Sequence, residues 1–197
     1  MFTTLKPLLL ASASPRRQKF LTDLGIEFTA LPADIDETPA SNECPDAYAM
    51  RMAQSKALFI SRTHPDHYII GSDTIISLDN NILGKPTDSI QAFHYLKQMQ
   101  GRAHKVITGL ALICKQQNTS ITLSETTEVT FDHFPDDLLK AYINTGEPMD
   151  KAGAYALQGV GSFLVKTING SSTNVIGLPL NTCISILLQE NIISPQL

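Results

Sequence analysis

The chain has 197 residues and a formal net charge of −4, which suits a single domain and argues against nonspecific binding to nucleic acid or to an acidic membrane surface. Its hydrophobic content of 43% is ordinary for a globular protein, and no apolar run is long enough for a membrane span. Three cysteines without metal-binding spacing predict free thiols in a cytoplasmic protein.

The first motif joins a buried strand to the start of a helix. Leu8–Ala11 is an apolar run that predicts a strand, and a hydroxyl-rich turn beginning at Ser12 leads into a helix over Pro15–Leu24. Arg16 and Arg17 place two cations where a helix already carries partial positive charge. A bound phosphate would explain this arrangement, because serine hydroxyls, free N–H groups and guanidinium groups all suit it. An ordinary helix start is the alternative.

An acidic patch and a long helix follow. Ile26–Leu31 alternates as a second strand, and Asp34–Glu37 then forms the patch, in which Glu37 is a functional candidate beside the simpler interpretation of a solvated loop. The helix expected over Pro45–Arg62 has apolar residues at spacings of three and four. Lys56 lies in or beside that apolar stripe, either as a functional ammonium or as a lysine that covers the core.

The next strand, His67–Leu78, carries a carboxylate in its middle. The residues on both sides of Asp73 are apolar without alternation, which is typical of a strand covered on both faces. A buried carboxylate needs a cation, a metal ion or water beside it, so Asp73 is either an ion-pair partner or a functional group. Gly71 allows another backbone or a ligand to approach closely.

Two later segments are candidates for ligand contact. Gly84-Lys85-Pro86 ends a return strand and would present the Lys85 ammonium to a cleft. The segment Glu147–Gly159 is rich in small residues, and the amide of Gln158 could read a base edge, with a simple packing loop as the alternative. The remaining elements are expected as a helix to about Gln100, a hairpin of His104–Cys114 and Ser120–Phe131, a helix from Pro135 to Thr145, a strand over Phe163–Ile168 and a helix over Leu178–Gln189.

This element order predicts an α/β fold. We expect a mixed twisted sheet with helices on both faces and an antiparallel hairpin extension. The whole chain, residues 1–197, is expected to form one domain with a cleft between two lobes, and ligands of such sheets bind outside the strand ends.

The charged residues indicate metal-assisted hydrolysis of a phosphorylated small molecule. Asp73, with Glu37 or Asp36, could hold a divalent cation through oxygen atoms, and a carboxylate could act as the base for an attacking water. No glycine-rich phosphate loop or dinucleotide fingerprint is present. The cations that could neutralise a polyphosphate are Arg16, Arg17, Lys56 and Lys85.

Several motifs together carry a family resemblance over nearly the whole chain. They are Ser12-Ala13-Ser14-Pro15-Arg16-Arg17, Gly71-Ser72-Asp73-Thr74, Gly84-Lys85-Pro86, Ala152-Gly153-Ala154-Tyr155-Ala156-Leu157-Gln158-Gly159, Ile168-Asn169-Gly170-Ser171 and Val175-Ile176-Gly177-Leu178-Pro179. In this order they resemble the Maf family of nucleoside triphosphate pyrophosphatases, once named for inhibition of septum formation. The resemblance implies a fold similar to that of inosine triphosphate pyrophosphatases.

The resemblance also implies roles for single residues. The family's proton acceptor falls on Asp73, and its specificity-linked positions fall on Arg16, Thr74 and Gln158. Ser12, Arg17, Lys56 and Lys85 would bind phosphate, and Glu37 and Asp73 would hold a divalent cation, Mg²⁺ or Mn²⁺. Thr74 and Gln158 resemble the branch that cleaves dTTP and UTP between the α and β phosphates.

Two other functions are alternatives to this hypothesis. One is a nucleotide-binding regulator of septum formation that needs no turnover, and the other is an inosine triphosphate-type pyrophosphatase. Modified pyrimidine nucleotides remain open as substrates, and a homodimer is expected by analogy alone.

Overall fold

The computed structural model describes residues 1–196. The strands of the sheets are β1 (Phe2–Thr4), β2 (Leu8–Leu10), β3 (Thr29–Ala30), β4 (Tyr68–Leu78), β5 (Asn81–Leu83), β6 (Ala103–Cys114), β7 (Thr119–Phe131), β8 (Val165–Asn169) and β9 (Ile193–Pro195). The α-helices are α1 (Pro15–Asp23), α2 (Pro45–Ser61), α3 (Ser89–Met99), α4 (Asp136–Asn144), α5 (Ser172–Ile176) and α6 (Leu180–Gln189). Three 3₁₀ helices are η1 (Glu147–Asp150), η2 (Ala152–Ala154) and η3 (Val160–Leu164).

The larger sheet is mixed, as the element order predicts. Its strands follow the order β3-β2-β4-β6-β7-β8, and β5 pairs with β4. β2 is parallel to both β3 and β4, whereas the β4–β5 and β7–β8 pairs are antiparallel. β6 and β7 are neighbours joined by the turn 115–118, which confirms the expected hairpin.

The chain divides into two compact units. Unit 1 contains Met1–Asp73, Thr108–Glu125 and Gly177–Leu197, and unit 2 contains Thr74–Ile107 and Thr126–Ile176. Three strands, β4, β6 and β7, therefore contribute residues to both units.

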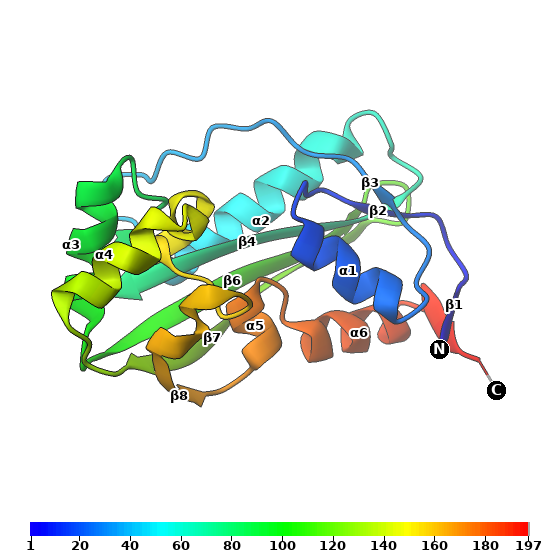
Figure 1. Cartoon of the computed structure of the whole chain (residues 1–197). Coiled ribbons are helices and arrows are strands. Elements are labelled where there is room, and N and C mark those ends of the chain that lie inside the picture. Colours follow the sequence, from blue (N-terminus) through cyan, green and yellow to red (C-terminus); the bar gives the residue numbers. More distant parts are fainter. Residues whose placement is uncertain (197) are drawn as a thin grey trace. The chain divides into compact units, whose positions relative to one another are not determined.

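In unit 1, helices cover both faces of the strands (Figure 1). Leu8 and Leu10 of β2 pack in one apolar cluster with Leu21 of α1 and Ile186 of α6. The residue between them, Leu9, packs in another cluster with residues of α2. Because side chains alternate along a strand, this division places α1 and α6 on one face and α2 on the other. The prediction of helices on both faces is confirmed.

α2 lies unusually close to β4 at a single glycine. A Cβ atom at Gly71 would meet the carbonyl oxygen and carbonyl carbon of Ala53 and the Cβ of Ala57. The absence of a side chain at this position therefore allows the helix backbone to approach the strand. Lys56 and Asp73 lie on these two elements, so the close approach also brings their side chains within reach of each other.

We expect Gly71→Ala to destabilise the protein by about 1–3 kcal/mol, the usual cost of overpacking a filled interior. The added methyl group would displace α2 from β4 because it meets backbone atoms rather than the end of a flexible side chain. Urea unfolding of the variant measures the loss. Gly84→Ala is the matched control, since a Cβ at Gly84 meets no atom within 4 Å. Equal stability of the two variants would contradict the argument.

Unit 2 has its own apolar core. Leu96 and Met99 of α3 and Leu139 of α4 pack with Phe131 of β7 and Leu164 in a buried cluster. The same cluster includes Tyr142 and Tyr155. Tyr142 precedes the Glu147–Gly159 segment that carries Gln158, and Tyr155 lies within that segment.

Some expected boundaries differ from the structure. The strand predicted over Ile26–Leu31 is regular only at β3, because β3 pairs with β2 alone at the edge of the sheet. The pairing of β1 with β9, which brings the two ends of unit 1 side by side (Figure 1), was not predicted. α5 was not predicted either. Within residues 1–196, no helix combines the length and apolar character needed to cross a bilayer.

Candidate functional site

The serine-arginine turn of unit 1 is a connected polar cluster. Ser12 is buried, and its Oγ accepts hydrogen bonds from the N–H of Ser14 at 3.2 Å and from Nη1 of Arg17 at 3.2 Å. Nε of Arg17 donates to the carbonyl oxygen of Gly177 at 2.7 Å. A hydroxyl that accepts twice still has its own hydrogen to donate, so Ser12 is suited to an anionic ligand.

Arg17 is held in place by burial and by these bonds. Burial lowers the pKa of its guanidinium, while the negative charge of Asp73 opposes that shift. Arg16, the adjacent residue on α1, is half-buried, and its Nε is buried without a hydrogen-bond partner among residues 1–196. A buried unsatisfied donor is costly. A bound anion would satisfy that donor.

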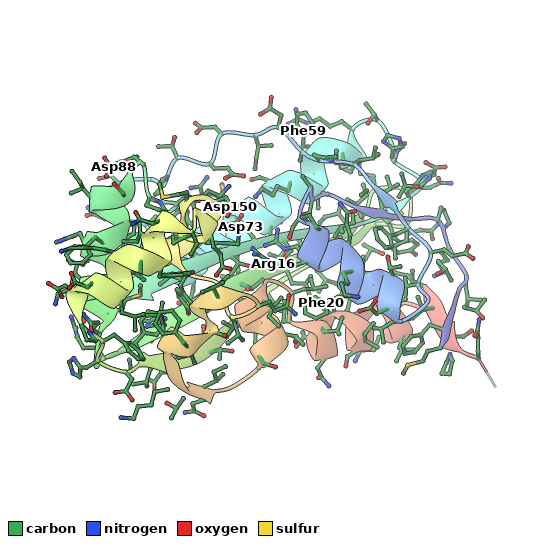
Figure 2. All side chains as sticks on the ribbon, viewed as in Figure 1. Arg16, Phe20, Phe59, Asp73, Asp88 and Asp150 are labelled. Carbon is green, nitrogen blue, oxygen red and sulfur yellow. The ribbon has the colours of Figure 1, made fainter. Side chains whose placement is uncertain are left out.

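Lys56 joins two carboxylates. Its Nζ donates to Oδ1 of Asp73 at 2.6 Å and lies 2.7 Å from Oε1 of Glu37. The side chains of Lys56 and Asp73 are 11% and 14% exposed, so the ammonium pairs with carboxylates rather than reaching into water. The structure thus supplies a cation beside the largely buried Asp73. Figure 2 marks Asp73 on β4 and Arg16 on α1.

The loop that carries Glu37 is fixed by α2. The hydroxyl of Tyr48 donates to the carbonyl oxygen of Glu37 at 2.7 Å. Arg51 donates to both carboxylate oxygens of Glu43, at 2.6 Å each, and to the carbonyl oxygen of Thr38. The hydrogen bond from Arg51 lowers the pKa of Glu43 to about 2, so Glu43 stays ionised at neutral pH. Glu37 therefore lies on a loop that side chains of α2 hold in place.

The donor set near Lys56 fits a divalent cation that binds together with phosphate. Glu37 and Asp73 offer carboxylate oxygens, and among residues 1–196 no group of three or more acidic, histidine or cysteine side chains could hold a metal ion. Mg²⁺ keeps several waters and commonly binds through one or two carboxylates plus substrate phosphates. Glu37 and Asp73 together supply that number of carboxylates, although both are paired with Lys56.

Thr74, Lys85 and Gln158 belong to unit 2. Thr74 is half-buried on β4, and Lys85 and Gln158 are exposed. The segments that carry the last two are tied together, because the N–H of Gly153 donates to the carbonyl oxygen of Gly84 at 3.0 Å. Unit 1 thus brings together Ser12, Arg16, Arg17, Glu37, Lys56 and Asp73, and unit 2 joins the Gly84–Pro86 and Ala152–Gly159 motifs.

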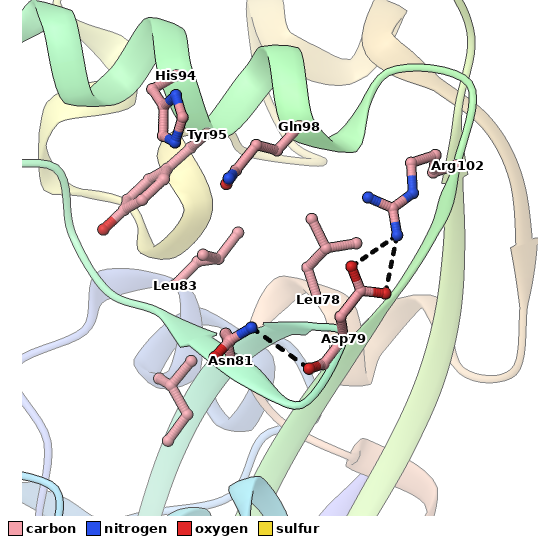
Figure 3. Close-up of a pocket in the computed structure, with 9 residues that line it drawn as sticks. Leu78, Asp79, Asn81, Leu83, His94, Tyr95, Gln98 and Arg102 are labelled. Carbon is pink, nitrogen blue, oxygen red and sulfur yellow. Dashed lines mark hydrogen bonds and ion pairs between the residues drawn. The ribbon is translucent and has the colours of Figure 1, made fainter.

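A separate pocket of about 350 Å³ lies in unit 2 and contains none of the predicted site residues (Figure 3). Leu78 and Leu83 form part of its lining, and Arg102 donates to both carboxylate oxygens of Asp79 at its edge. The exposed ion pair already satisfies these charges. We assign the candidate site to the clusters described above because they hold the unsatisfied donor and the paired carboxylates.

Sequence reasoning did not identify several residues that hold the site. The carbonyl oxygen of Gly177 accepts from Arg17 and also from Oγ of Ser72 at 3.4 Å. Tyr48 and Arg51, which fix the Glu37 loop, lie within the helix expected over Pro45–Arg62, but this role was not predicted. Apart from the match of Val175–Pro179 to the family's closing segments, no sequence pattern signals these contacts.

The geometry defines an α/β protein with a serine-arginine turn at the start of α1 and a pair of carboxylates bridged by Lys56. The family described as Maf-like protein matches residues 7–190, which is nearly the whole sequence. The chain belongs to the Maf family.

Curated relatives agree with this assignment. The chain is 45% identical to a dTTP/UTP pyrophosphatase of Desulfotalea psychrophila over 98% of this chain and 100% of that protein. It is 44% identical to a protein of the same name from Myxococcus xanthus, over 91% of this chain and 90% of the relative. The corresponding protein of Nitratidesulfovibrio vulgaris is 41% identical over 100% and 93%.

The fold also has a relative of known structure. A HAM1 protein from Coxiella burnetii superposes with a TM-score of 0.52 at 15% identity, covering 94% of this chain and 100% of that one. At this identity the likeness concerns the fold alone. It confirms the fold that the family resemblance implies.

Proposed function

We propose that this protein is a nucleoside triphosphate pyrophosphatase that hydrolyses dTTP and UTP to the monophosphate and pyrophosphate. The relatives that carry this name span almost the whole chain at 41–45% identity. The observation that carries the proposal is the cluster in unit 1, where Lys56 holds Asp73 at 2.6 Å and the charge of Asp73 acts on the guanidinium of Arg17.

Each residue has a role suited to its chemistry. Asp73 accepts the proton of the water that attacks the α phosphorus, and the bond to the pyrophosphate leaving group breaks. Ser12, Arg16 and Arg17 donate hydrogen bonds to phosphate oxygens, and the arginine charges offset the charge that develops there. Arg16 also bears on which base is accepted.

The remaining assigned residues add charge and selectivity. Lys56 and Lys85 offset phosphate charge, and Thr74 and Gln158 contribute to the choice of a pyrimidine base. Glu37 and Asp73 would hold Mg²⁺ or Mn²⁺, which neutralises phosphate charge when bound. A nucleotide substrate favours the cytoplasm as the location. That location, the homodimer and the single domain over residues 1–197 stay predictions.

A substrate panel tests the proposed function. Purified protein is incubated with Mg²⁺ or Mn²⁺ and each of dTTP, UTP, CTP, ATP, GTP, ITP and a modified pyrimidine triphosphate, and pyrophosphate and orthophosphate are measured separately. We expect pyrophosphate from dTTP and UTP. A preference for ITP would support the inosine triphosphate-type alternative, and release of orthophosphate alone would overturn the proposed reaction.

A further inference from the structure

A single carboxylate in unit 2 holds the backbone just after Gln158. Oε2 of Glu147 accepts from the N–H of Val160 at 2.9 Å, and Oε1 accepts from the N–H of Gly161 at 2.8 Å. Partial burial works to raise the pKa of Glu147, but the hydrogen bonds from Gly161, Val160 and Tyr142 outweigh it and leave the pKa lowered. Glu147 is therefore an ionised acceptor at neutral pH.

Tyr142 of α4 supports this carboxylate from the other side of the contact. Its buried hydroxyl donates to Oε1 of Glu147 at 3.0 Å. The pair formed by Glu147 and Tyr142 thus fixes the chain two and three residues after Gln158. We call this pair the Glu147–Tyr142 clamp.

The neighbouring glycines are required by the clamp. A Cβ atom at Gly159 would collide with the Glu147 carboxylate, and one at Gly161 would collide with the Tyr142 hydroxyl. Gly159 also has a φ of +136°, a conformation that other residues rarely adopt. The backbone beside Gln158 therefore depends on this close approach.

Other bonds anchor the earlier part of the segment. Nε2 of His104 is hydrogen-bonded to the hydroxyl of Tyr155 at 2.9 Å, and both side chains are buried. Gly153 donates to Gly84, as described above. Gln158 itself is exposed in a stretch without regular secondary structure, between anchored residues on both sides. Its amide therefore projects from a backbone that its neighbours fix.

We propose that Glu147 is a positioning residue that sets base selectivity by holding Gln158 in place through the Glu147–Tyr142 clamp. This inference rests on the proposed function. Glu147 does not need to touch the nucleotide, because its bonds end on backbone N–H groups and on Tyr142. An amide donor and acceptor held in a fixed place can match the edge of a uracil or thymine base, whereas a mobile one discriminates poorly.

Glu147→Gln and Tyr142→Phe test the clamp. Glutamine keeps the size of Glu147 but cannot accept both N–H bonds equally well, because one of its oxygens is replaced by an NH₂ group. In each of the two variants we expect kcat/KM for UTP and dTTP to fall about 10–100-fold, mainly through a higher KM. The kcat/KM for purine triphosphates should change little. The pyrimidine-to-purine ratio is the readout, since general damage to the fold would lower all substrates together.

Two controls separate selectivity from folding. Glu128→Gln makes the same change at an exposed position of β7 in unit 2 and should leave the ratio unaltered. In a Gln158→Ala background, Glu147→Gln should cause no further change in the ratio if Glu147 acts through Gln158. Thermal unfolding of each variant shows that it is folded.

The outcomes distinguish the inference from the function on which it rests. Wild-type protein that releases no pyrophosphate from UTP or dTTP would overturn the proposed function and the selectivity role together. An active wild type with the same ratio in Glu147→Gln, or an equal loss for every nucleotide, would overturn the positioning role alone. A further fall in the ratio when Glu147→Gln is added to Gln158→Ala would also overturn it.

Discussion

Asp73→Asn is expected to lower pyrophosphate release from UTP and dTTP by about 10²–10⁴-fold, the usual contribution of a positioned proton acceptor. Asparagine has nearly the same shape, and its Oδ1 can still accept the hydrogen bond that Lys56 donates to Asp73 at 2.6 Å. It cannot take up the proton of an attacking water at neutral pH. Steady-state release of pyrophosphate measures the loss, and circular dichroism shows that the fold is kept.

The matched control is Asp66→Asn, which removes an exposed carboxylate just before β4 that pairs with His67. This variant should retain wild-type turnover. Full activity in Asp73→Asn would show that Asp73 is not the proton acceptor. Retained nucleotide binding with altered septation in an inactive Asp73→Asn variant would instead support the regulator alternative.

Lys56→Met is expected to bind Mn²⁺ at least about tenfold more tightly than wild type in the absence of nucleotide, while its turnover falls. In the present arrangement the Lys56 ammonium lies 2.6 Å from Asp73 and 2.7 Å from Glu37, the two carboxylates assigned to the metal. At an effective dielectric constant of about 20, two like unit charges about 4 Å apart repel by about 4 kcal/mol. Removing the ammonium therefore frees both carboxylates for a divalent cation.

Isothermal titration of nucleotide-free protein with Mn²⁺ gives the affinity directly, without any dependence on catalysis. Lys19→Met is the control, because Lys19 pairs with Asp23 on the exposed side of α1 in the same unit. An affinity unchanged by Lys56→Met would show that the metal does not use these carboxylates. Loss of the gain in Lys56→Met/Asp73→Asn would assign the added affinity to Asp73.

Strands and helices that follow from the pattern of residues adjacent in the sequence were predictable. The apolar run around Asp73 predicted β4 almost to the residue, because a strand covered on both faces has a continuous apolar pattern. The apolar spacing in α2 placed Lys56 in or beside its apolar stripe, and Lys56 is buried in the structure. Composition and spacing were sufficient for these elements.

Contacts that join distant segments were not predictable in the same way. The Glu147–Tyr142 clamp ends on backbone N–H groups, which every residue except proline carries, so no residue type marks them in the sequence. β1 and β9 contain only three residues each, too few for an alternating pattern. Their existence depends on tertiary pairing.

The carbonyl oxygen of Gly177 determines how late in synthesis the candidate site can form. It accepts from Arg17, 160 positions earlier, and from Ser72, 105 positions earlier. During synthesis from the N-terminus, the serine-arginine turn exists long before this acceptor has been added to the chain. Arg17 can adopt its final hydrogen bonding only after Gly177 has emerged from the ribosome, so a growing chain completes this part of the candidate site late.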